Sequence, residues 1–212
     1  MSQQQSQSKL LSHKLLKPLK ARLTPALVAL VIGASAMLPA AQAADSGMNE
    51  LKQVLKGQID MMKPELADKV KALSTDTKMQ LMAILAMHSR YSKEATLRQV
   101  MLEVLADYQT MVMGIMTDSN EMAADAARRL ANHRIPVGGL LPYMGLENIS
   151  DARLAVLGSF NDSVEGNANK LADAAQAGDM ATAASLLGSI SSGCVGCHAV
   201  FRSLPGKSDL LK

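Results

Sequence analysis

The chain has 212 residues, of which 48% are hydrophobic, with two cysteines, no tryptophan and a formal net charge of +3. This length suits one domain, or one domain with an appendage. The positive charge does not indicate a nucleic-acid partner, because residues 1–43 hold five basic residues and no acid. The rest of the chain has 17 basic against 19 acidic residues, a net charge of about −2.

Residues 1–43 are expected to be a secretory signal peptide. A basic start is followed by an apolar run of about 13 residues, Ala26 to Leu38, which ends at the small-x-small sequence Ala41-Gln42-Ala43. Spanning a bilayer takes roughly 20 residues, so an uncleaved anchor is only the alternative. Cleavage after Ala43 predicts a periplasmic protein with no membrane span in the mature chain.

Residues 44–92 are expected to form a helical extension. Apolar residues recur there at spacings of three and four, from Met48 to Met87. Pro64 interrupts this pattern and starts a new helix. These short amphipathic helices could extend the rest of the molecule or form a partner surface.

Residues 93–212 are expected to form four longer helices. No stretch shows the two-residue alternation of a strand, so the sequence predicts an all-α fold. Two short turns and one longer connection between the helices are typical of an antiparallel four-helix bundle. The four helices are expected at about Lys93–Thr117, from Asp118 to just before Pro136, at about Ser150–Ala177, and from Asp179 to Pro205. Asp118 and Glu121 have the spacing of a capping box at the start of the second helix, and Gly178 is expected to end the third.

The last helix contains the sequence Cys194-Val195-Gly196-Cys197-His198. Residues at i, i+3 and i+4 share one face of a helix, so both thiols and the imidazole point the same way. Covalent haem attachment needs this geometry, because the thiols add to the two vinyl groups while the histidine ligates the iron. In an exported protein, Cys-x-x-Cys-His is a specific sign of a c-type haem.

Two other interpretations of the cysteines have weaker support from the sequence. A structural zinc site usually needs a second ligand pair, and the sequence offers none, since His88 and His133 look isolated. A thioredoxin-like redox pair needs a preceding strand and an α/β setting, and neither is visible.

The motif continues to Phe201-Arg202, and this resembles the Cys-x-x-Cys-His-x-x-Phe-Arg signature of the cytochrome c′ family, the class II c-type cytochromes. The pair Arg98-Gln99 and the helix lengths extend the resemblance over roughly residues 93–205. It implies a left-handed four-helix bundle, one covalent haem c, His198 as the proximal iron ligand and frequently a homodimer.

The resemblance also implies roles for three polar residues. Arg98 and Gln99 would donate hydrogen bonds to the haem propionates, and Arg202 would lie against the haem near its proximal side. From the residues alone, Arg98 and Arg202 could equally be solvated helix charges.

The position opposite His198 decides what the haem does. By resemblance, six-coordinate relatives place a methionine four residues after the arginine, and five-coordinate relatives place an apolar side chain there. That position is Leu102, which implies an apolar distal side open to small gases. Met101, about 100° around the helix, is the alternative sixth ligand, and a His/Met pair gives a low-spin electron carrier.

We therefore expect a periplasmic electron-transfer cytochrome that meets redox-partner proteins. The alternative is a five-coordinate haem protein that scavenges or senses NO or CO. An enzyme is not expected, because no distal histidine or arginine has the spacing for acid–base catalysis. Residues 44–92 have no counterpart in the family pattern, and their helices could also cover the haem edge. A departure of this size puts the family's usual dimer interface in doubt.

Overall fold

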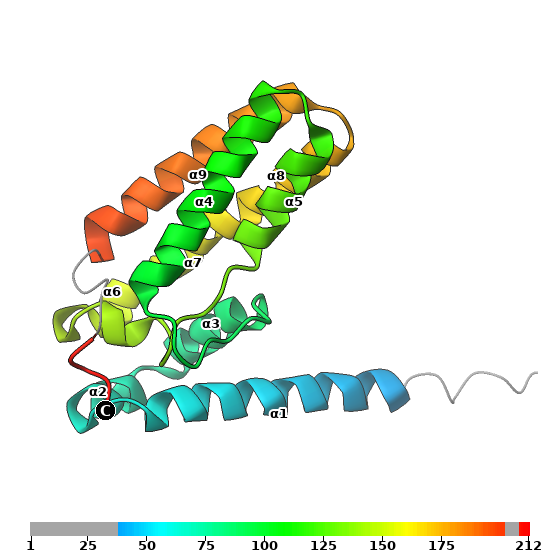
Figure 1. The fold of residues 1–212 in the computed structure, drawn as a ribbon. Helices are drawn as coiled ribbons and strands as arrows, with labels where there is room; N and C mark the ends of the chain where they lie inside the picture. Colours follow the sequence, from blue (N-terminus) through cyan, green and yellow to red (C-terminus); the bar gives the residue numbers. More distant parts are fainter. Residues whose placement is uncertain (1–37, 202–207) are drawn as a thin grey trace, which may run out of the picture.

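The computed structural model describes residues 38–201 and 208–212. These residues form helices and no strand, so the predicted all-α class is confirmed (Figure 1). Most of the expected signal peptide and Arg202 lie outside the described residues. The elements are α1 (Leu38–Asp60), α2 (Pro64–Ala72), α3 (Thr75–Ala86), α4 (Leu97–Met116), α5 (Asn120–Ala131), η1 (Leu141–Tyr143), η2 (Leu146–Asn148), α6 (Asp151–Leu154), α7 (Leu157–Asn161), the π-helical segment η3 (Asp162–Gly166), α8 (Asn167–Gln176) and α9 (Met180–Phe201).

Helices α1 to α3 lie together at one end of the molecule (Figure 1). Pro64 is the first residue of α2, as the sequence predicts, because its missing N–H is not needed there. Ser74 caps α3 by accepting a hydrogen bond from the Thr77 N–H at 3.2 Å. The N–H and hydroxyl of Ser74 also donate to Asp151 Oδ1, both at 3.0 Å, which ties the extension to α6.

An apolar core joins the extension to the connection that follows α5. Met62 and Leu66 pack there with Met144 of the connection and Leu154 of α6, and all four are almost fully buried. The C-terminal residues close this core, since Lys63 N donates to Leu210 O at 2.9 Å.

Helices α4, α5, α8 and α9 lie side by side in the other half of the molecule (Figure 1). Their shared core is rich in small side chains, which lets the helices approach closely. A Cβ on Gly114 would lie 2.5 Å from the backbone nitrogen of Ala123, so only glycine fits between α4 and α5 there. The fully buried residues of this core include Met111, Ala123, Ala126, Ala127, Leu130, Leu171, Ala175 and Ile190.

Two details of the predicted helices are wrong. Asp118 does not cap the second long helix; it has a φ of +55°, and α5 begins after Ser119. The helix expected at 150–177 is broken into α6, α7, η3 and α8. Its predicted end is confirmed, because Gly178 has a φ of +78° and Asp179 Oδ1 accepts from Thr182 N at 3.0 Å to cap α9.

Within the described part of the chain, α9 is the single helix long and apolar enough to cross a membrane on length and composition alone. Its residues Ala183, Leu187 and Ile190 are buried in the core formed with α4, α5 and α8. Burial of this kind is also what a core helix of a helical domain shows.

Candidate functional site

The two cysteines and the adjacent histidine lie on one unbroken turn of α9. Cys194 and Cys197 are free thiols, both half-buried, and His198 is exposed. Cys194 packs against the core that contains Ile190, and Cys197 packs against the core that contains Phe201. The motif therefore lies on a regular helical turn, and neither sulfur is in a disulfide.

Both thiols are held in the neutral form. Burial, and secondly the negative charge of Glu165, raise the pKa of Cys194 and raise that of Cys197 to about 11. Both sulfurs therefore remain protonated at neutral pH.

The side of α9 at Gly196 is covered by an aromatic ring. A Cβ on Gly196 would lie 3.0 Å from Cε1 of Phe160. The rings of Phe160 and Phe201 meet edge to face, with centroids 6.3 Å apart. These contacts fix the C-terminal turn of α9 against α7.

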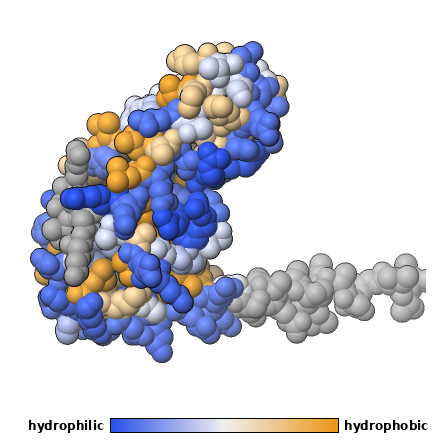
Figure 2. Space-filling view, viewed as in Figure 1, coloured by the Kyte–Doolittle hydropathy of each residue, from blue (hydrophilic) through white to orange (hydrophobic). Residues whose placement is uncertain are grey.

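Helix α4 contacts α9 about one turn before the motif. Tyr108 Oη and Ser191 Oγ form a 2.5 Å hydrogen bond between α4 and α9. Met101, seven residues before Tyr108, is half-buried, whereas Leu102 is 61% exposed. Apolar side chains gather over α4 and α9 on the face shown in Figure 2. Leu105 and Val195 also stay exposed on these two helices.

The other residues expected to contact a haem have different surroundings. Arg98 is exposed in the first turn of α4. Gln99 takes part in a capping box, because its Oε1 accepts from Thr96 N at 2.8 Å while its own N–H donates to Thr96 Oγ1 at 3.4 Å. Arg202 lies outside the described residues.

The expectation that His88 and His133 are isolated is wrong. Their ring centroids are 4.6 Å apart, and His133 Nε2 lies 3.2 Å from Glu165 Oε1. Burial, with the nearby His133 as a second cause, lowers the pKa of His88, so its ring is neutral at pH 7. Sequence spacing cannot reveal this cluster, since its members come from three distant segments.

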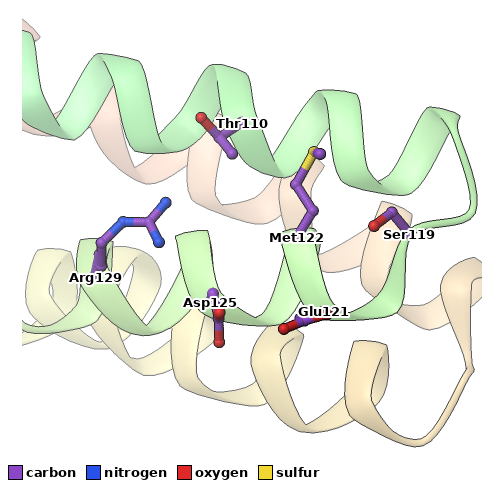
Figure 3. Close-up of a pocket in the computed structure, with 6 residues that line it drawn as sticks. All are labelled: Thr110, Ser119, Glu121, Met122, Asp125 and Arg129. Atoms are coloured by element: carbon purple, nitrogen blue, oxygen red, sulfur yellow. The ribbon is translucent and has the colours of Figure 1, made fainter.

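A shallow groove of about 310 Å³ lies between α4 and α5 (Figure 3). Met122 and Arg129 extend from α5 toward Thr110 of α4 in this view. The guanidinium of Arg129 is already paired with Asp107 Oδ1 at 2.8 Å. Four of the residues that line the groove, Glu121, Met122, Asp125 and Arg129, are exposed.

Comparison of the chain with known protein families, with curated proteins and with solved structures found no match.

Proposed function

We propose that this protein is an exported c-type cytochrome, with one haem c attached to Cys194 and Cys197, that transfers electrons to and from partner proteins in the periplasm. The observation behind this proposal is the placement of both free thiols and His198 on one turn of α9. When bound, the haem supplies a reversible one-electron couple.

The donor set fits a haem c better than another group. The two sulfurs at i and i+3 match the two-point attachment of the porphyrin, and the exposed imidazole of His198 at i+4 is on the same side of the helix. The apolar side chains of Leu102 and Leu105 on α4 and Val195 on α9 are exposed, and an apolar cofactor bound between these two helices would cover them.

We further propose that Met101, not Leu102, faces the iron. Figure 1 shows α4 and α9 running in opposite directions, and the Tyr108–Ser191 hydrogen bond sets their relative position. Seven residues are almost two full turns, about 10 Å of helix. Going back seven residues from Tyr108 reaches Met101, and going forward seven from Ser191 reaches His198.

The facing positions of Met101 and His198 support a His/Met ligand pair, which gives a low-spin electron carrier. We propose that α4, α5, α8 and α9 form the antiparallel, left-handed four-helix bundle of the cytochrome c′ family. The segment from α6 to η3, which precedes α8, would complete its third helix. In this arrangement His198 and Met101 would hold the iron, the apolar side chains of α4 and α9 would exclude water, and the haem would supply the electron exchanged with a redox partner.

Two measurements test the two parts of this proposal, and the first is extraction of the purified protein to test covalent attachment. A covalent haem stays with the chain after extraction with acidified organic solvent, and Cys194→Ala with Cys197→Ala releases it. If wild-type haem also extracts fully, the attachment proposal is wrong.

The sixth ligand is tested on the ferrous protein with and without CO. We expect a low-spin spectrum that CO does not change in the wild type and in Leu102→Ala, and a high-spin, CO-binding spectrum in Met101→Ala. Rapid CO binding by the wild type would contradict Met101 ligation. It would favour instead the five-coordinate gas-binding function, with Leu102 over the iron.

A further inference from the structure

Three ligand-type side chains converge where the extension, α5 and η3 meet. His88 follows the end of α3, His133 follows the end of α5, and Glu165 lies in η3. One ligand atom from each lies within 4.8 Å of the other two. None of these residues belongs to the proposed haem site.

The hydrogen bonds of the two rings determine which nitrogens can bind a ligand. Nδ1 of His88 is 3.0 Å from the carbonyl oxygen of Ile84, and Nδ1 of His133 is 2.7 Å from that of Arg134. A carbonyl only accepts, so each Nδ1 must donate its proton. In His88 this leaves a lone pair on Nε2. Nε2 of His133 lies 3.2 Å from Glu165 Oε1, and a bound metal ion would replace the proton shared by these two atoms. Histidines that bind metals are commonly oriented by such a second-shell bond.

Two of the converging atoms have no partner. His88 is 5% exposed, and its Nε2 is buried without a hydrogen bond. The second carboxylate oxygen of Glu165, Oε2, is buried and unpartnered as well. Leaving buried polar atoms unsatisfied costs free energy, which a bound cation would recover.

Hydrogen bonds between the neighbouring residues Ser89 and Asn132 hold the cluster in place. Ser89 N donates to Asn132 Oδ1 at 3.0 Å, and Asn132 Nδ2 donates to Ser89 Oγ at 2.9 Å, so the residues next to His88 and His133 are joined directly. Glu165 comes from a π-helical turn, and such turns are frequent at functional sites. The ligands are thus fixed before any ion binds.

We propose that His88, His133 and Glu165 form a binding site for one divalent first-row transition-metal ion. Two imidazoles and one carboxylate are a donor set typical of zinc and ferrous iron, and a fourth position is left for water. Tetrahedral ligands about 2.0–2.2 Å from zinc lie about 3.3 Å from one another. His133 and Glu165 already have this separation, at 3.2 Å. The site would join three segments that are distant in sequence.

Zinc titration by calorimetry of the full exported protein, stripped with a chelator and dialysed, tests the site. We expect one zinc per chain, whether or not haem is attached. His88→Gln and Glu165→Gln should each weaken zinc binding at least tenfold, and Asp162→Asn, an exposed acid in the same π-helical turn, should not. Circular dichroism of each variant checks that it folds.

Thiols also bind zinc, so the double variant Cys194→Ser, Cys197→Ser tests whether they are the ligands; we expect it to keep its zinc. X-ray absorption of the zinc-loaded wild type needs no mutation and should show only nitrogen and oxygen neighbours, without sulfur near 2.3 Å. No binding by the wild type, unchanged binding in His88→Gln, or sulfur coordination would overturn the proposal. None of these results depends on whether the haem proposal is correct.

Discussion

Two glycines of α9 give a matched test of how tightly this helix packs beside the thiols. A Cβ on Gly193 would lie 2.8 Å from Cγ2 of Val164 and 2.9 Å from Cβ of Ser163, whereas a Cβ on Gly188 would meet nothing within 4 Å. Both substitutions to alanine gain about 1 kcal/mol of helix propensity. Only Gly193→Ala also overpacks the core, at a cost of about 1–3 kcal/mol.

The free energy of unfolding, measured by urea denaturation of both variants and the wild type, should therefore rise by up to about 1 kcal/mol in Gly188→Ala. Gly193→Ala should be less stable than Gly188→Ala by about 1–3 kcal/mol, because the propensity gain cancels in this comparison. The urea dependence should be equal in all three proteins, showing that the same surface unfolds. Equal stability of the two variants would refute close packing of η3 against α9.

Three further predictions concern stability and reactivity. Met111→Ala, at a wholly buried position, should cost about 2–5 kcal/mol in urea unfolding, and Leu102→Ala, at a position 61% exposed, under about 1 kcal/mol. Asp151 has a pKa held below its usual value, first by a hydrogen bond from the Thr77 side chain. The ionised Asp151 carboxylate therefore stabilises the folded protein fully above the ordinary pKa of a carboxyl group, and this stabilisation is lost as the pH falls through the lowered pKa of the folded protein. In Asp151→Asn the free energy of unfolding should fall less steeply with decreasing pH than in the wild type. Because Cys197 has a pKa of about 11, iodoacetamide should alkylate it more slowly at pH 8 in haem-free chain than in urea-unfolded chain. Equal rates would show that this thiol is accessible and ionised.

The sequence predicted most of the helices, because their amphipathic spacing and their boundary residues are local signals. Pro64 begins α2, and Gly178 and Asp179 separate α8 from α9, as expected. The prediction that Asp118 caps the second long helix was wrong, because the residue has a left-handed backbone conformation and does not occupy the capping position. The prediction of one continuous third helix was also wrong, because the π-helical turn η3 has no characteristic spacing of apolar residues that the sequence could reveal.

The proposed haem-attachment residues could be found from the sequence because Cys194, Cys197 and His198 are neighbours on one helix. The proposed placement of Met101 opposite His198 could not be inferred from the sequence, since it depends on the Tyr108–Ser191 contact between two helices. The cluster of His88, His133 and Glu165 depends likewise on how α3, α5 and η3 pack.

The π-helical turn η3 connects both proposed sites, and removing one residue from it tests that connection. Deletion of the exposed Asp162 would convert η3 to an α-helical turn and rotate α7 by about 100° relative to α8. Since α8 is fixed in the core by Leu171 and Ala175, α7 would have to move, and Phe160 would leave Gly196.

Loss of the half-buried Phe160 should lower the free energy of unfolding by about 2 kcal/mol, roughly half the cost of removing a fully buried phenylalanine. Zinc affinity should fall less than in Glu165→Gln, because Glu165 lies on the α8 side of the deletion. Asp162→Asn, which keeps the chain length, should change neither property. If the deletion leaves stability unchanged, the extra residue of η3 does not position α7. If it abolishes zinc binding as fully as Glu165→Gln does, Glu165 is positioned by the π-helical turn itself and not by α8.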